Sequence, residues 1–333
     1  MSVQCTVLGA GAWGTALACH LSHAGPVKLW ARRAELATEI ATRRSNPQYL
    51  PDVHLPDGIS VTTGFAEAVA FAGADGLIIL ATPVAGLPAA LTALAGHGHL
   101  PPIVGVAKGI DPASGELPHQ LAARLMPDHS FGVLSGPSFA AEVARELPCA
   151  LVAAGDRATT AQQIQQVFHR RALRVYLSDD LLGVELAGAL KNVMALAAGI
   201  ADGLALGDNA RAALVTRGLA EMTRLGVALG AQPSTFMGLA GLGDLMLTCT
   251  GGLSRNRRVG LALATGQPVA QITRSLGHVA EGVPCCAAAL AQAAAVGVDL
   301  PIASAVQAVI DQRQTARDAV SSLLARDPIA ESQ

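Results

Sequence analysis

A glycine-rich segment near the start of the chain has the spacing G-x-G-x-x-G, at Gly9, Gly11 and Gly14. It follows an apolar run that predicts a strand and precedes an alanine-rich run that predicts a helix, which is the context this motif requires. Gly9 permits a tight turn, Gly11 lets a pyrophosphate approach the backbone, and Gly14 lets the helix pack on the strand. Because the helix N-terminus also favours phosphate, we predict a dinucleotide site here.

Two arginines, Arg32 and Arg33, follow the second predicted strand. In an NAD-specific site, an Asp or Glu lies about 20 residues after the glycine-rich turn and accepts hydrogen bonds from the ribose 2′-hydroxyl. A guanidinium cannot accept such a bond but can pair with a 2′-phosphate. The alternative is a solvated basic pair at the start of a helix. We favour the first interpretation, which predicts NADPH as the preferred cofactor and NADH as a second one.

Lys191 lies in the middle of the apolar run Leu186–Leu206, which predicts a buried helix. Burying an unpaired ammonium is costly, so a lysine in this position usually has a partner or a chemical task. Desolvation lowers the pKa of a lysine toward neutrality and makes it a usable proton donor and acceptor. The alternative is a lysine whose head group reaches the surface. Spacing alone does not decide between the two.

Two further polar residues follow predicted strands of the first half. Lys108 ends a parallel strand, and ligands of such sheets bind beyond the carboxyl ends of the strands. Ser138 follows the next strand. Its hydroxyl either caps the predicted helix Phe139–Arg145 or contributes to a phosphate or substrate site at the start of that helix. The spacing is compatible with both interpretations.

In the second half, Asp244 places one carboxylate in an apolar run, and the glycine-, Ser- and Arg-rich segment Gly251–Arg258 follows it. Backbone N–H groups, a hydroxyl and a bidentate cation at a helix start suit a phosphate dianion. The alternative is a solvated basic helix end. However, cations at a helix N-terminus oppose the helix dipole unless an anion lies nearby. We therefore favour an anion site.

The first half alternates short apolar runs with alanine-rich helical runs, which is typical of a mostly parallel, Rossmann-type sheet covered on both faces. The proline-rich stretch Asn46–Pro56 predicts a long surface loop. After the strand predicted at Ala172–Leu177, strand signals nearly vanish. We predict a dinucleotide-binding α/β domain over residues 1–179 and an all-helical substrate and catalytic domain over residues 180–333. The helices predicted in the second domain are Leu181–Leu206, Asn209–Leu229, Pro233–Leu247, Arg255–Thr265, Val283–Val296 and Ala303–Leu324.

Composition argues against several other classes of protein. Lys and Arg number 23 against 25 Asp and Glu, and aromatic residues are 3%, so a basic, stacking surface for nucleic acid is not expected. No run reaches the roughly 18 consecutive apolar residues of a membrane span, and the first apolar stretch lacks a preceding cation and contains the glycine-rich turn, unlike a signal peptide. We expect a cytoplasmic protein. The six cysteines form no C-x-x-C pair, so we expect reduced thiols and no metal site.

Taken together, these segments closely resemble bacterial NAD(P)-dependent glycerol-3-phosphate dehydrogenases, in order from about residue 5 to about residue 325. The segments that carry the resemblance are GAGAWGTALA, VAKGI, LSGPSFAAEV, GALKNVMALAAGIADGL, TRGLAEMTRLG, GLAGLGDLMLTCTGGLSRNRR and VAEGV. The resemblance implies interconversion of dihydroxyacetone phosphate and sn-glycerol 3-phosphate, which supplies phospholipid synthesis. The implied partners are small molecules, and a homodimer is compatible with this family.

The resemblance also implies roles for individual residues. Lys191 corresponds to the proton donor and acceptor. The implied substrate contacts are Lys108, Gly136, Ser138, Lys191, Asp244, Ser254, Arg255 and Asn256. The implied cofactor contacts, together with the glycine-rich turn at Gly9, Gly11, Ala12 and Gly14, are Trp13, Arg32, Arg33, Tyr49, Lys108, Ala140, Arg255, Val279 and Glu281.

The chain departs from the family pattern at Ala12, where a Ser is common, and at Pro284, Cys285 and Cys286, where small polar residues are usual. Two other functions fit parts of the sequence. Ketopantoate and 3-hydroxyisobutyrate oxidoreductases share the two-domain plan, but their substrates carry a carboxylate, and the basic segment after Gly251 favours a phosphate. A non-catalytic NADP(H) sensor on the same fold would not require Lys191 and Asp244 in apolar surroundings.

Overall fold

One sheet in the amino-terminal half contains eight strands, β1 (Cys5–Leu8), β2 (Val27–Trp30), β5 (Ile59–Thr62), β6 (Leu77–Leu80), β7 (Ile103–Gly105), β8 (Phe131–Ser135), β9 (Cys149–Gly155) and β10 (Leu173–Ser178). The computed structural model describes residues 2–276 and 280–326. The strand order is β10-β9-β8-β7-β6-β1-β2-β5, and each pair is parallel except β8 with β9. The prediction of a mostly parallel sheet is confirmed.

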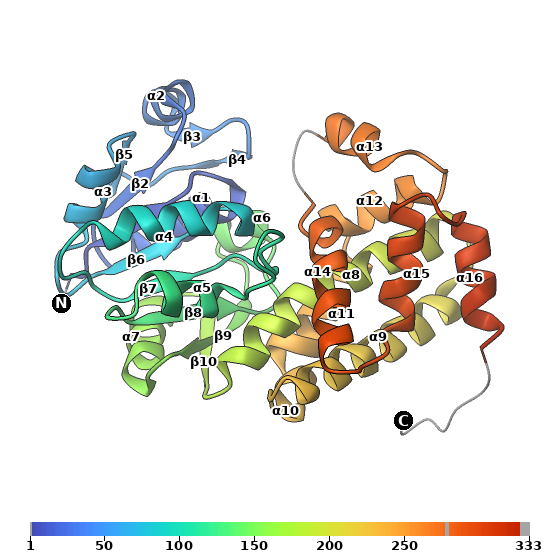
Figure 1. The fold of residues 1–333 in the computed structure, drawn as a ribbon. Coiled ribbons are helices and arrows are strands. Elements are labelled where there is room, and N and C mark those ends of the chain that lie inside the picture. Colours follow the sequence, from blue (N-terminus) through green and yellow to red (C-terminus); the bar gives the residue numbers. More distant parts are fainter. Residues whose placement is uncertain (1, 277–279, 327–333) are drawn as a thin grey trace.

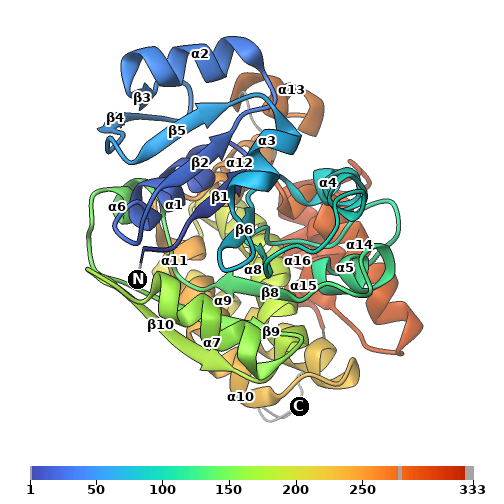
Figure 2. The ribbon, with the colours of Figure 1, turned by 90° about the vertical axis from the view of Figure 1, so that its left-hand side faces the viewer.

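Helices cover both faces of this sheet (Figures 1 and 2). Successive residues of a strand point to opposite faces, so Val7 and Ile79 enter one core while Leu8 and Leu80 enter the other. This double burial explains the continuous apolar runs of the strands. On the first face lie α1 (Ala12–Leu21), α2 (Ala34–Arg43), α6 (Ala140–Ala144) and α7 (Ala158–Phe168). On the second lie α3 (Phe65–Phe71), the short helix Val84–Gly86, α4 (Leu87–Ala95) and α5 (Pro118–Leu125).

The stretch Asn46–Pro56 is not the surface loop that its prolines predict. It contributes to an antiparallel pair of strands, β3 (Ser45–Asn46) and β4 (Leu50–His54). Val53 and Leu55 are buried in the core beneath α1, so their burial holds the segment against the sheet domain. Proline is tolerated in this two-stranded pair because strand edges leave backbone N–H groups unpaired.

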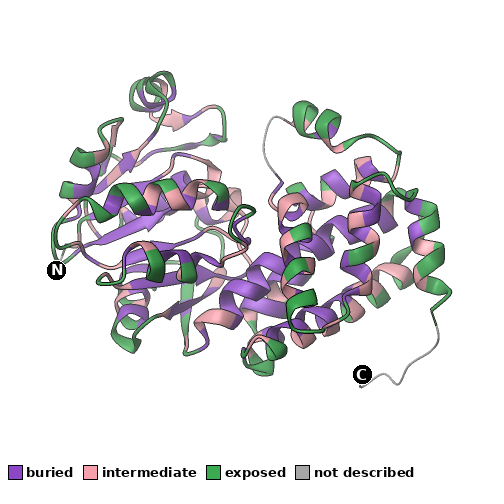
Figure 3. Ribbon diagram, in the orientation of Figure 1, coloured by how far each residue is buried: buried purple, intermediate pink, exposed green. Residues whose placement is uncertain are grey.

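A long helix, α8 (Leu181–Gly203), runs through the middle of the carboxyl-terminal half, where it is buried along most of its length (Figure 3). By length and composition α8 would suffice to cross a membrane, but 89% of its most apolar window is buried inside the protein. Its apolar residues therefore form the core of the helical domain. Around it lie α9 (Asp208–Ala228), α10 (Pro233–Met237), α11 (Asp244–Thr250), α12 (Arg255–Leu263), α13 (Val269–Leu276), α14 (Gly282–Ala295), α15 (Pro301–Ile310) and α16 (Ala316–Leu324).

Two of the predicted helices are interrupted. The segment Pro233–Leu247 contains α10, a turn of π-helix at Leu239–Gly243 and then α11. Ala303–Leu324 is divided between α15 and α16. In the first segment the apolar residues continue across the break, so hydrophobic periodicity alone does not locate it. In the second, the break coincides with the polar run Asp311–Thr315. The first break has a chemical consequence, because it places Asp244 at the start of a new helix.

Candidate active site

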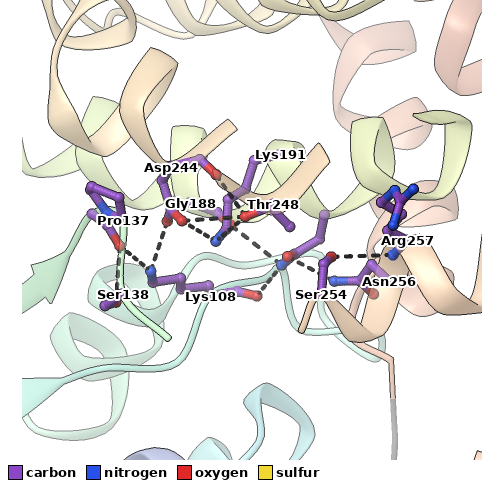
Figure 4. A network of polar contacts seen from close by, with 12 residues as sticks. Lys108, Pro137, Ser138, Gly188, Lys191, Asp244, Thr248, Ser254, Asn256 and Arg257 are labelled. Atoms are coloured by element: carbon purple, nitrogen blue, oxygen red, sulfur yellow. Dashed lines mark hydrogen bonds and ion pairs between the residues drawn. The ribbon is translucent and has the colours of Figure 1, made fainter. Parts of the chain in front are cut away.

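A cluster of buried charges lies where α8 meets the sheet domain (Figure 4). Lys191 is 6% exposed, and its Nζ donates hydrogen bonds to Asp244 Oδ1 and, at 2.9 Å, to Thr248 Oγ1. The other carboxylate oxygen, Asp244 Oδ2, accepts a hydrogen bond from Lys108 Nζ at 2.7 Å. Lys108 Nζ also donates to the Gly136 carbonyl at 2.8 Å. One carboxylate thus joins a lysine of the sheet domain to a lysine of the helical domain.

The charges in this cluster change one another's proton affinity. Burial lowers the pKa of the Lys191 ammonium to about 8, with Asp244 opposing this effect and the charge of Lys108 adding to it. Burial alone would raise the pKa of the Asp244 carboxyl, but the two ammonium groups outweigh burial and lower it. Asp244 is therefore an anion at neutral pH, whereas Lys191 can exchange a proton in the range where enzymes operate.

A second network of amides surrounds the lysines. Asn192 Nδ2 donates to the Lys108 carbonyl at 2.9 Å, and Asn192 Oδ1 accepts from Asn256 Nδ2 at 2.9 Å. Asn256 Oδ1 in turn accepts from the Gly282 backbone N–H at 3.0 Å. No role for Asn192 was expected from the sequence. The signal that applies to Lys191, a polar residue within an apolar helix, applies to Asn192 as well.

The Ser138 and Lys108 side chains donate hydrogen bonds to the same carbonyl oxygen, that of Gly136. The distance from Ser138 Oγ to this oxygen is 3.0 Å. The interpretation of Ser138 as a helix cap is wrong. The N-cap of α6 is Phe139, and no side chain caps that helix. The Ser138 hydroxyl therefore belongs to the turn that carries the Lys108 contact.

At the start of α12, a side chain caps the helix and an exposed arginine follows it. Ser254 is the N-cap, and its Oγ accepts a hydrogen bond from the Arg257 N–H at 3.2 Å. Arg255 is the first residue of the helix, is exposed, and its side chain makes no hydrogen bond or ion pair within residues 2–276 and 280–326, although its charge opposes the rise that burial causes in the pKa of Glu281. Its guanidinium is available to an anion, as the predicted phosphate site requires.

The glycine-rich turn has the geometry that a pyrophosphate requires. Gly9 adopts a φ of +130°, and a Cβ added to Gly14 would lie 1.9 Å from the Gly9 carbonyl oxygen. No atom lies within 4 Å of a Cβ added to Gly11, so the space beside this residue is open. The α1 N-terminus, which begins at Ala12, has no side-chain cap, and Trp13 Nε1 is buried without a partner in the described chain. These features fit a dinucleotide phosphate.

Arg32 and Arg33 are exposed beyond the end of β2. Arg33 Nη2 donates to Gln48 Oε1, which the turn between β3 and β4 presents. Tyr49, 36% exposed, follows Gln48 in this turn. The strand pair that replaces the predicted loop thus brings Tyr49 and Arg33 into one region. It also places Gln48 there, for which the sequence predicted no role.

Asn46 connects the same strand pair to the glycine-rich turn. It is fully buried, and its Nδ2 donates to the Ala10 carbonyl at 3.0 Å and to Thr15 Oγ1 at 2.8 Å. The amide therefore supports the turn from outside the sheet. Because Asn46 lies in a proline-rich stretch, its sequence context indicated a loop and no role.

Glu281 joins the helical domain to the sheet domain, since its Oε1 accepts from the Val84 N–H at 3.3 Å, beyond the end of β6. Burial raises the pKa of the Glu281 carboxyl. Ala140 begins α6, which packs against α1. Both residues lie on elements next to the predicted dinucleotide crevice. Val279, the other cofactor contact implied for this segment, lies outside the described residues.

All six cysteines are unpaired. Cys285 and Cys286, which depart from the family pattern, are buried within α14. In the described residues, no three His, Cys, Asp or Glu side chains are grouped so that they could hold a metal ion.

Comparison with known proteins assigns this chain to a family. The amino-terminal model of NAD-dependent glycerol-3-phosphate dehydrogenase matches residues 4–161, and the carboxyl-terminal model matches residues 180–321. The chain belongs to the NAD-dependent glycerol-3-phosphate dehydrogenase family. The resemblance found in the sequence is thereby confirmed.

Curated relatives that match this chain over nearly their whole length are named glycerol-3-phosphate dehydrogenase [NAD(P)+]. The chain is 53% identical to the glycerol-3-phosphate dehydrogenase [NAD(P)+] of Cupriavidus necator, over 98% of this chain and 99% of the relative. It is 51% identical to the protein of that name from Ralstonia nicotianae, over 99% of both. The similarity to these relatives therefore extends over nearly the whole chain.

Solved structures have the same fold as this chain. The glycerol-3-phosphate dehydrogenase of Coxiella burnetii superposes with a TM-score of 0.93 at 35% identity and covers 98% of this chain and 99% of its own. A 2-dehydropantoate 2-reductase from Bacillus subtilis superposes with a TM-score of 0.57 at 14% identity over 94% of this chain and 100% of its own. The second likeness is one of fold alone.

Proposed function

We propose that this chain catalyses the NAD(P)-dependent interconversion of dihydroxyacetone phosphate and sn-glycerol 3-phosphate. Family membership supports this activity. The single observation that carries it is the buried contact of Lys108 and Lys191 with Asp244, in a chain that also has a dinucleotide turn. A lysine with a pKa near neutrality can protonate an alkoxide as it forms. The direction we propose is reduction, which supplies glycerol 3-phosphate for phospholipid synthesis.

In this mechanism the chain's own residues manage charge and protons. A bound nicotinamide supplies or accepts the hydride at its C4. The Lys191 ammonium donates its proton to the oxygen on substrate C2, and in the reverse direction the neutral amine removes that proton. Lys108 polarises the same oxygen and disfavours a second positive charge on Lys191. Asp244 holds both lysines in place.

The remaining roles belong to the same proposal. We assign residues 1–179 to cofactor binding and residues 180–333 to substrate binding and catalysis, in a cytoplasmic enzyme that is compatible with a homodimer and acts without nucleic acid or a membrane span. The proposed substrate contacts besides Lys191 are Lys108, Gly136, Ser138, Asp244, Ser254, Arg255 and Asn256. The proposed cofactor contacts are Gly9, Gly11, Ala12, Trp13, Gly14, Arg32, Arg33, Tyr49, Lys108, Ala140, Arg255, Val279 and Glu281.

Arg255→Ala should raise KM for dihydroxyacetone phosphate by more than about tenfold, because the substrate phosphate loses a charge-assisted bidentate partner. The preference for dihydroxyacetone phosphate over unphosphorylated dihydroxyacetone should narrow by the same factor. Steady-state kinetics with both ketones measure this. Arg258→Ala is the matched control, since Arg258 is an exposed arginine of the same helix and should have little effect. Equal effects of the two variants would indicate a general basic surface instead of a phosphate site.

Replacing Arg32 and Arg33 together by alanine should weaken NADPH binding about 5- to 150-fold, which corresponds to roughly 1–3 kcal/mol, and change NADH binding little. The reason is that NADPH alone carries the 2′-phosphate. Fluorescence titration with both cofactors measures the difference. Arg43→Ala, at the other end of α2, is an exposed control that should affect neither affinity. Equal losses for the two cofactors would mean that Arg32 and Arg33 bind the common adenosine or support folding.

A spectrophotometric assay tests the function itself. Oxidation of NADPH should depend on dihydroxyacetone phosphate, and ketopantoate should not replace it. Turnover of ketopantoate would favour the reductases that share the fold. NADPH binding without turnover of any ketone would favour a sensor protein.

A further inference from the structure

The helices that carry the proposed proton donor and the proposed phosphate site touch backbone to backbone. A Cβ added to Gly260 on α12 would lie 2.2 Å from the Leu196 carbonyl oxygen of α8, and a Cβ added to Gly199 would lie 2.1 Å from the Arg257 carbonyl oxygen. Further along, Gly203 of α8 meets Ala264. The two helices therefore run side by side in the same direction from their contact with the sheet domain.

This contact relates two functional positions. Lys191 precedes Gly199 by two turns of α8, and Arg255 precedes Gly260 by about one and a half turns of α12. Both residues lie on the N-terminal side of the helix contact. Because helices are rigid over such lengths, the way α12 rests on α8 determines the separation between the Lys191 ammonium and the α12 N-terminus.

An ion pair fixes this packing. Arg257 Nε donates a hydrogen bond to Asp202 Oδ2 at 2.7 Å, and Arg257 Nη2 forms an ion pair with the same oxygen at 2.7 Å. The Asp202 and Arg257 side chains are only 11% and 19% exposed. The second oxygen, Asp202 Oδ1, accepts from Arg211 Nη1 of α9 at 2.8 Å. The charge of Arg257 is thus directed into the protein, away from the anion site that the exposed Arg255 can serve.

We propose that Asp202 is a positioning residue for the substrate phosphate. Through Arg257 it holds α12 against α8, so that the Ser254–Asn256 backbone and Arg255 lie at a fixed distance from Lys191. This spacing selects a ketone whose phosphate is one methylene away from the carbonyl carbon. The inference rests on the proposed function and adds a residue that does not itself touch the substrate.

Asp202→Asn tests the inference, because the neutral amide keeps the shape of the side chain and removes the charge that holds Arg257. KM for dihydroxyacetone phosphate should rise about tenfold, while kcat changes less than about threefold, since the Lys191 contacts are untouched. The kcat/KM for unphosphorylated dihydroxyacetone should stay within about twofold. A purely structural defect would lower activity toward both ketones.

Two companion variants sharpen the test. Arg257→Gln should reproduce the effect of Asp202→Asn, and the double variant should be no worse than either single one, because both remove the same contact. Arg211→Gln is the matched control. It removes the hydrogen bond from Arg211 to Asp202 Oδ1 but leaves the contact between Asp202 and Arg257. The preference for dihydroxyacetone phosphate over dihydroxyacetone should therefore be unchanged.

The outcomes separate this inference from the proposed function. A wild-type protein that does not reduce dihydroxyacetone phosphate would contradict the proposed function. If the wild type reduces it and Arg255→Ala narrows the preference, but Asp202→Asn does not, the positioning role is wrong. A lower KM in Asp202→Asn would also overturn the inference, because it would mean that a released Arg257 binds the phosphate directly.

Discussion

Lys191→Ala should lower kcat for reduction of dihydroxyacetone phosphate by about 10²- to 10⁴-fold, the usual effect of removing a general acid. NADPH affinity should change by no more than a few-fold, because the ammonium contacts Asp244 and Thr248 and lies on the helical domain. The fold should persist, since the Asp244 carboxylate keeps Lys108 as a partner. Steady-state kinetics and a fluorescence titration with NADPH measure the two quantities separately.

Lys191→Arg distinguishes proton transfer from charge. A guanidinium preserves the positive charge next to Asp244 but cannot release a proton near neutral pH, because its pKa lies far above that range. Kinetics of this variant should therefore resemble those of Lys191→Ala. A Lys191→Ala protein that retains more than a tenth of wild-type kcat would exclude Lys191 as the proton donor. A collapse of NADPH affinity in the same variant would indicate a structural role.

The features that the sequence predicts correctly are those that short segments determine on their own. Continuous apolar runs identify the parallel sheet because both of its faces are buried. The turn around Gly9 and the burial of the helix that carries Lys191 follow from local spacing in the same way. Each depends on a pattern within about twenty residues, so tertiary structure does not override it.

The features that sequence reasoning missed depend on partners distant in the chain. Asn46 binds the Ala10 carbonyl, and Asn192 bridges to Asn256, 64 positions away. A local pattern cannot indicate which buried amide finds such a partner. The break before Asp244 is similar, because the apolar spacing continues through Leu239–Gly243 while the backbone changes its hydrogen-bonding pattern. This break allows the Asp244 carboxylate to reach both lysines.

Asp244→Asn should have the second large effect, because the carboxylate neutralises two ammonium groups. An amide offers one acceptor oxygen, so Lys108 and Lys191 cannot both keep the hydrogen bonds that they make to Asp244. Removing one partner of a buried ion pair typically costs about 3–5 kcal/mol. We expect a lower melting temperature, measured by calorimetry, and a loss of kcat of at least about tenfold at pH 7.5.

The pH dependence of this variant separates its electrostatic effect from loss of stability. In the wild type, burial and Lys108 lower the pKa of Lys191 to about 8, whereas Asp244 raises it. Reduction requires the ammonium, so its rate should fall as pH rises through this pKa, and oxidation, which requires the free amine, should gain rate over the same range. Without the carboxylate the pKa of Lys191 falls further. The pH at which the reduction rate falls and the pH at which the oxidation rate rises should therefore both be lower by about one unit or more. Thr248→Val removes an uncharged acceptor of the same ammonium and should shift these pH dependences less. If the pH dependence of either rate in Asp244→Asn is unchanged, or moves to higher pH, Asp244 does not control the proton on Lys191.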